Sequence, residues 1–226
     1  MNVLKENCFV SCDNDNCILK ISGFHDGVNC IPEIRTVDYF RPKQDVFFER
    51  NSVKGIYFIL KGVVKVYKNN SYKDQIVRLS TSGEILGHRG IGKDKLPVSA
   101  QTLTETELCY IEKEQFSELL SKSATLATNL MLFFAEELNR EESKLSELSN
   151  FTVLEKGQMA VKIMIDSFGL TDDGHIIHSE LLSRKEIGEL VGLTANQITK
   201  TLKELQTDGL IKLEGKRIFV TDTLAF

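Results

Sequence analysis

The chain has 226 residues, of which 42% are hydrophobic and 27% are charged, a balance typical of a soluble globular protein with a substantial core. Its formal net charge of -4 means that any contact with a polyanion must come from a local basic patch. No apolar run reaches the roughly 18–20 residues needed to cross a bilayer, and residues 1–10 lack the apolar centre of a signal peptide. Composition therefore excludes a membrane-spanning protein, and we expect a cytoplasmic protein without a membrane partner.

The five cysteines are unevenly distributed along the chain. Four of them, Cys8, Cys12, Cys17 and Cys30, lie in the first thirty residues, and Cys109 stands alone. A reducing compartment argues against a disulfide framework. The grouping at the beginning of the chain therefore calls for another explanation.

From about residue 40 to residue 111 the sequence has the short period typical of β structure. Apolar and β-branched runs occupy residues 56–60, 63–67 and 75–79, with polar or glycine-containing turns at residues 61–62 and 69–70. Short strands joined by such turns predict an antiparallel roll or barrel.

A long helix is expected after the β region, because residues 115–150 contain no Gly or Pro and are rich in Leu, Ala, Glu and Lys. Leu130, Phe134, Leu138, Leu145 and Leu148 fall on one stripe, which Glu141 interrupts. The heptad-like spacing favours a seam between two subunits. The alternative is a helix packed only on its own domain.

Two further helices and a hairpin are predicted within residues 182–220. Ser183 and Glu186 form a capping box for the first helix, Gly192 provides the turn, and Thr194 caps the second helix. Gly209 ends that helix, and residues 210–220 contain two short β runs around a glycine turn. This order is typical of a winged helix-turn-helix, which inserts its second helix into the major groove of DNA.

The outward positions of this segment carry groups suited to DNA. Asn can bond an adenine edge, and Lys or Arg can reach guanine or a phosphate. The candidate DNA-binding residues are Ser183, Arg184, Thr194, Ala195, Asn196, Thr199, Lys200, Lys203, Lys216 and Arg217. The alternative is a module for protein contacts without DNA binding, because residues 151–226 carry nine Lys and Arg against eleven Asp and Glu.

Three segments in this order resemble the CRP/FNR family of transcription regulators. Residues 182–211 (LSRKEIGELVGLTANQITKTLKELQTDGLI) resemble the family's helix-turn-helix, and residues 55–67 (GIYFILKGVVKVY) resemble its cyclic-nucleotide-binding-type β-roll. Residues 83–87 (GEILG) resemble the start of the loop that holds a phosphate in nucleotide-binding members. The resemblance covers the chain from about residue 20.

The resemblance implies an α+β fold in three parts: an N-terminal segment and antiparallel, jelly-roll-like β-roll sensor in residues 1–117, a long dimerisation helix in residues 118–150, and a winged helix-turn-helix in residues 151–226. It also implies a homodimer that binds a near-palindromic double-stranded operator and contacts RNA polymerase. In the second helix, Asn196, Thr199 and Lys200 stand where the family commonly has Glu, Ser or Gly, and Arg. An operator different from the family's best-known sites is therefore expected.

A cyclic nucleotide is the first of three effector hypotheses. The candidate pocket residues are Gly83, Glu84, Gly87, His88, Arg89 and Ser99. The resemblance calls for an Arg beside Ser99, and this chain has Val98. A buried phosphate would then lack its bidentate partner, which argues against cAMP.

An iron–sulfur cluster is the second hypothesis. Thiolates bind such clusters in fours, and Cys8, Cys12, Cys17 and Cys109 resemble the set used by the oxygen-sensing branch of the family, although their spacing differs. The alternative is that Cys109 is an ordinary core residue. A third hypothesis is a different effector or none, and the effector stays unknown at this stage.

An enzyme is not expected. The sequence shows no paired catalytic carboxylates, no nucleophile motif and no NTPase-type phosphate loop.

Overall fold

The computed structural model describes residues 15, 17–23, 35–69, 74–222 and 226. The chain divides into two compact units. The first contains the described residues up to Lys65 together with Ser80–Arg140, and the second contains Val66–Leu79 and Glu141–Phe226.

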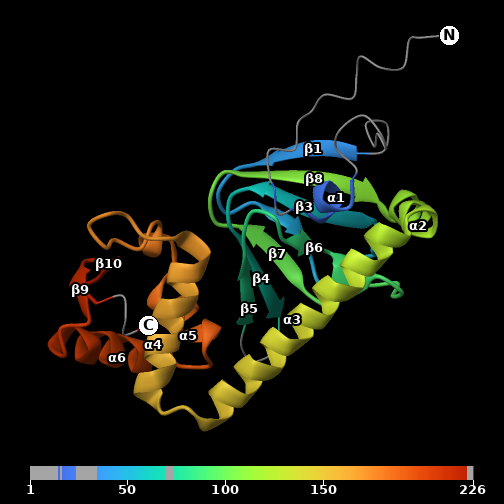
Figure 1. Ribbon diagram of the computed structural model, residues 1–226. Coiled ribbons are helices and arrows are strands. Elements are labelled where there is room, and N and C mark those ends of the chain that lie inside the picture. The colour runs from blue at the N-terminus through green and yellow to red at the C-terminus, as the bar shows by residue number, and fades with distance from the viewer. Residues whose placement is uncertain (1–14, 16, 24–34, 70–73, 223–225) are drawn as a thin grey trace. The chain divides into compact units, whose positions relative to one another are not determined.

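Two four-stranded sheets form the β-roll, as Figure 1 shows in blue to green. The first has the order β1 (Arg35–Phe40), β8 (Thr106–Glu112), β3 (Gly55–Lys61) and β6 (Ile85–Leu86). The second has the order β2 (Asp45–Phe47), β7 (Ser99–Thr102), β4 (Val64–Asn69) and β5 (Asp74–Ser80). Strands distant in sequence are neighbours in both sheets, which confirms the predicted jelly-roll-like roll.

The core of the roll follows from the alternation in its central strands. In β3 the side chains of Ile56 and Phe58 are buried, and Phe58 lies opposite Cys109 of β8 in the antiparallel register. Strand β1 begins before the predicted β region. The strand lies at the edge of its sheet, where it pairs with β8, and its Tyr39 is 75% exposed. An edge strand of this kind needs no continuous apolar run, so the sequence pattern did not indicate it.

The prediction of a single helix over residues 115–150 is wrong, because the structure has two helices there. Helix α2 covers Lys113–Lys122 and α3 covers Ala124–Asn150, with Ser123 in extended conformation between them. The Ser123 Oγ accepts a hydrogen bond from the Leu126 backbone amide at 3.2 Å. Serine in this role begins a new helix, because it satisfies an amide that the first turn leaves unpaired.

The predicted apolar stripe of α3 is buried at its beginning and exposed further along the helix. Leu130 is buried and Phe134 packs against the core of the roll. Leu138 and Leu145, by contrast, are 58% and 68% exposed. The N-terminal part of the stripe therefore belongs to the roll's own core, whereas Leu138 and Leu145 of the same stripe are exposed, as is Met131 beside it.

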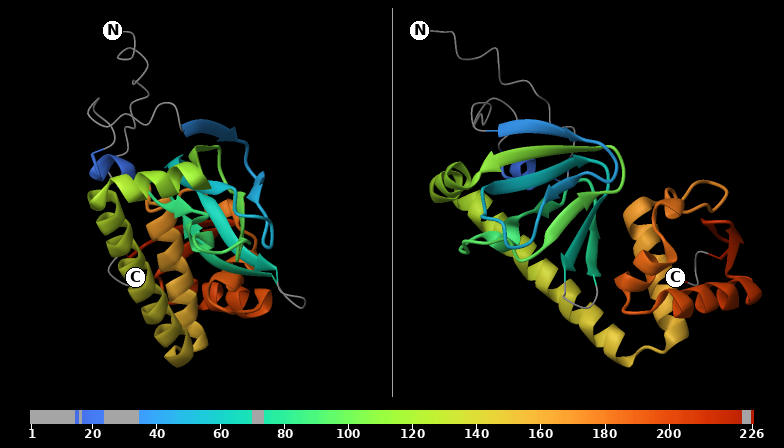
Figure 2. Two further views of the ribbon diagram at one scale, coloured as in Figure 1. Left: turned by 90° about the vertical axis from the view of Figure 1, so that its right-hand side faces the viewer. Right: turned by 180° about the vertical axis from the view of Figure 1, so that it is seen from behind.

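The C-terminal part of the chain contains the predicted winged helix-turn-helix (Figure 2). Its elements are α4 (Val153–Phe168), the 3-10 turn η2 (Ser179–Leu181), α5 (Arg184–Leu190), α6 (Ala195–Thr207) and the antiparallel strands β9 (Ile211–Glu214) and β10 (Arg217–Val220). Ile187, Ile198 and Leu202 are fully buried between the helices. Among the described helices, none is both long and apolar enough to cross a membrane.

Candidate nucleic-acid interface and effector loop

Helix α6 begins at a reciprocal cap that fixes its start. The Thr194 hydroxyl accepts from the Gln197 amide, and the Gln197 side-chain oxygen accepts from the Thr194 amide at 2.9 Å. Gly192, at φ 72°, makes the turn before it, in a conformation that favours glycine. With Ile198 and Leu205 buried, the opposite side of α6 faces outward.

The outward side of α6 carries the predicted base-reading groups. Asn196, Lys200 and Lys203 are exposed, whereas Ala195 and Thr199 are half-buried. The Thr199 hydroxyl donates to the Ala195 carbonyl at 2.6 Å, so that its proton is used within the helix. Asn196 and Lys200 are therefore the side chains best placed to present donors to bases.

The predicted phosphate contacts in α5 and the hairpin differ in their surroundings. Arg184 donates to the Gly215 carbonyl at 3.5 Å in the β9–β10 turn, and burial lowers the pKa of its guanidinium. It therefore links α5 to the hairpin turn. Lys216 and Arg217 are exposed at that turn, and the Ser183 hydroxyl belongs to the capping box of α5.

The candidate effector loop follows β5 and leads to the 3-10 turn η1 (His88–Gly90). Gly83 has a φ of 94° and Gly87 caps η1 at a φ of 81°. The Glu84 carboxylate accepts from the Thr81 amide at 3.1 Å, and its other oxygen lies 3.7 Å from Arg140 of α3.

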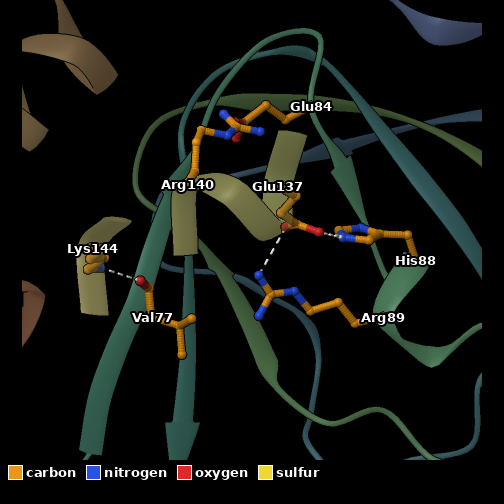
Figure 3. A network of polar contacts seen from close by, with 7 residues as sticks. All are labelled: Val77, Glu84, His88, Arg89, Glu137, Arg140 and Lys144. Carbon is orange, nitrogen blue, oxygen red and sulfur yellow. Dashed lines mark hydrogen bonds and ion pairs between the residues drawn. The ribbon is translucent and has the colours of Figure 1, made fainter. Parts of the chain in front are cut away.

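Helix α3 brings a carboxylate to this loop. Glu137 Oε2 lies 2.8 Å from His88 Nε2, and Glu137 Oε1 accepts from Arg89 Nη2 at 3.0 Å (Figure 3). The sequence analysis missed Glu137 and Arg140. The available signal was the spacing of Leu130, Phe134 and Glu137, which places an acidic residue on the helix face that packs against the roll.

Ser99 and Val98, the pair compared with the phosphate-binding residues of the family, are both buried. The Ser99 Oγ accepts from the Glu49 amide at 2.9 Å, so it links β7 to the segment after β2. Val98 itself carries no charge. That cAMP is not the ligand stays a prediction, based on the uncharged residue at position 98.

The described cysteines of the candidate metal set lie in one apolar cluster. Cys17, which precedes α1 (Ile18–Ile21), and Cys109 of β8 are 3% and 1% exposed within the same core. Cys8 and Cys12 lie outside the described residues. Within the described part of the chain, no group of three or more His, Cys, Asp or Glu side chains is placed to hold a metal ion.

Two models of known protein families match this chain, one in each part. Residues 37–123 match the model of the cyclic nucleotide-binding domain, and residues 166–225 match that of the Crp-like helix-turn-helix domain.

Known transcription regulators are similar to this chain over most of its length. The chain is similar to the transcriptional activator protein anr of Pseudomonas aeruginosa, with 24% identity over 180 residues, covering 79% of this chain and 74% of the relative. It is also similar to the fumarate and nitrate reduction regulatory protein of Salmonella typhimurium, with 25% identity over 185 residues, covering 80% and 74%. Among solved structures, FixK2 from Bradyrhizobium japonicum has a TM-score of 0.73 at 21% identity, covering 84% of this chain and 94% of that one.

Proposed function

Since the chain belongs to the CRP/FNR family of transcription regulators, we propose that it binds double-stranded DNA as a homodimer and reads a near-palindromic operator. Members of this family are regulators and not enzymes, which agrees with the sequence analysis. The observation that carries the proposal is the outward face of α6, where Asn196, Lys200 and Lys203 are exposed without an acidic neighbour before Glu204.

Each of the following side chains has a role that its chemistry allows. Asn196 bonds an adenine edge through its amide, and Lys200 donates to guanine or to a phosphate. Ala195 offers an apolar contact to a thymine methyl group. Lys216 and Arg217 hold the backbone phosphates from the hairpin turn.

The proposed dimer is supported by exposed apolar residues of α3. Met131, Leu138 and Leu145 are 64%, 58% and 68% exposed, and they recur every seven residues. Apolar residues at this interval can occupy one of the two apolar heptad positions in the seam of a two-stranded coiled coil. Such a seam would hold two α6 helices about 34 Å apart, one turn of DNA, so that each reads one half-site.

We propose that an effector binds at the loop from Gly83 to Arg89. We also propose RNA polymerase as a partner, as the family implies. An effector there would act through its different affinity for two arrangements of the dimer, with a hinge near residues 150–151, between α3 and α4. We propose that the effector, if there is one, is not cAMP, because Val98 provides no charge for the phosphate.

A gel-shift selection with the full chain and genomic fragments tests DNA binding. We expect retarded fragments that share an inverted repeat, and binding that weakens steeply as salt rises, because phosphate contacts release counterions. Lys162→Ala, a charge change on the exposed face of α4, should leave the selected fragments unchanged. If no fragment survives competition with random DNA, the module serves protein contacts instead.

A second candidate is an oxygen or redox sensor with an iron–sulfur cluster, and the observation in its favour is that Cys17 and Cys109, distant in sequence, lie in the same core. Both are thiols, the ligands that such clusters require, and Cys8 and Cys12 would complete a set of four. A cluster bound there would give the roll an oxygen-sensitive group. The relatives named for fumarate and nitrate reduction and for anr point to the same branch of the family.

Purification without oxygen decides this candidate. We expect broad visible absorption and about four irons per chain, with sulfide, in the wild type. Cys109→Ser should lose both, whereas Cys30→Ser, outside the candidate set, should keep them. A colourless and iron-free anaerobic wild-type protein would exclude the cluster.

A further inference from the structure

Glu137 of α3 has a buried carboxylate, whereas the other charged side chains of this helix are exposed or half-buried. Glu137 is 7% exposed, whereas Glu136 and Arg140 beside it are exposed. A carboxylate removed from water is costly unless charged or polar donors surround it. The His88 and Arg89 side chains supply these donors, one to each oxygen, at 2.8 and 3.0 Å.

Both donors, His88 and Arg89, lie in the effector loop. They are consecutive residues of η1, directly after the Gly87 cap. The rings of Phe133 and Phe134 lie 5.4 and 5.6 Å from the His88 ring, so the site has an apolar wall on the α3 side. Figure 3 shows Glu137 entering the loop from α3 between the His88 and Arg89 side chains.

We propose that the Glu137 carboxylate is a built-in ligand of the effector loop, and that a ligand bearing a carboxylate binds there by replacing it. The proposal rests on the proposed function only in taking this loop as the effector site. The chemistry of the ligand is set by the group now seated there, because two donors converge on the two oxygens of one carboxylate. The Phe133 and Phe134 rings would contact the apolar body of such an acid.

Replacement of Glu137 would also change how α3 is attached. Arg140, one turn further along, lies 3.7 Å from Glu84, so the loop contacts α3 at two successive turns. Leu138, which follows Glu137 directly, belongs to the outward row proposed as the dimer seam. A ligand that released Glu137 would therefore act on the helix next to that seam, which gives the loop a direct connection to dimerisation.

Chemical rescue tests the proposal. Glu137→Ala removes the equivalent of one acetate ion, so the melting temperature should fall by about 4 °C or more, and sodium acetate should restore part of it with saturation. The wild type should not respond to acetate beyond sodium chloride of the same ionic strength. The double variant Glu137→Ala with Arg89→Gln should lose the rescue, because one of the two donors is gone.

Matched variants keep the outcome clear. Glu136→Ala removes an exposed carboxylate from the same turn and should change neither stability nor the acetate response. Glu137→Gln keeps the volume of the side chain but removes its charge. Its melting temperature should be lower than that of Glu136→Gln, and acetate should not raise it. This comparison replaces the alanine variant if that variant does not fold. Equal melting temperatures for the two positions, or an acetate effect shared by all variants, would overturn the proposal. None of these measurements involves DNA, so a failure of DNA binding would be recognised separately.

Discussion

Gly157 of α4 lies directly against Thr201 of α6: a Cβ atom on Gly157 would be 2.0 Å from the Thr201 Cγ2. No real side chain tolerates this distance, so Gly157 allows α4 to support the buried side of the DNA-reading helix. Thr201 is only 2% exposed and has little room to move away. The position of α6 therefore depends on a residue that has no side chain.

Gly157→Ala should destabilise the protein by about 1–3 kcal/mol, the usual cost of an extra methyl group in a packed core. Urea unfolding measures the change. Thr201→Ser removes the Cγ2 methyl group that would clash, so the double variant should recover part of the loss. Additive effects of the two substitutions would mean that Gly157 and Thr201 do not limit each other.

Lys200→Ala should weaken operator binding by about 1–3 kcal/mol if Lys200 reads a base, because its side chain is exposed in the middle of α6. Fluorescence anisotropy with operator and random duplexes separates the two possible roles. A loss restricted to the operator indicates a base contact, whereas an equal loss on both duplexes indicates a phosphate contact. Lys162→Ala of α4 should affect neither duplex.

The elements of the helix-turn-helix could be predicted from the sequence because their signals are local. Ser183 and Thr194 lie three residues before Glu186 and Gln197, and both pairs form the reciprocal caps that this spacing favours. Ser123 carried a similar local signal, but the surrounding helix-forming residues obscured it. The break between α2 and α3 was therefore missed.

The pairing of the effector loop with α3 could not be predicted in the same way. Glu137 and His88 are 49 residues apart, and only the packing of α3 against the roll brings them together. The same packing decides that Leu130 is buried and Leu138 exposed, although both lie on one predicted stripe. A helical period shows which residues share a face, but the domain that covers part of the helix decides which face is free.

Leu138→Glu should weaken self-association by more than about tenfold, because the seam would bring two carboxylates into an apolar contact. Sedimentation velocity over a concentration series measures this change. Leu132→Glu is the matched control: Leu132 is also 58% exposed, but it lies outside the seven-residue row of Met131, Leu138 and Leu145. An equal effect of both substitutions would argue against a seam along that row.

Tyr57 should make the roll sensitive to alkali. Burial raises its pKa to about 12, with smaller contributions from Tyr110, whose ring centroid is 4.8 Å away, and from Asp38. In the unfolded chain a tyrosine ionises near its ordinary pKa of about 10. Between these two values the unfolded state binds fewer protons than the folded state, so stability must fall as the pH rises. Tyr57→Phe should unfold in urea with a weaker dependence on pH over this range than the wild type, and Tyr39→Phe, at a 75% exposed position, should match the wild type. Parallel curves for all three proteins would show that Tyr57 ionises equally easily in both states.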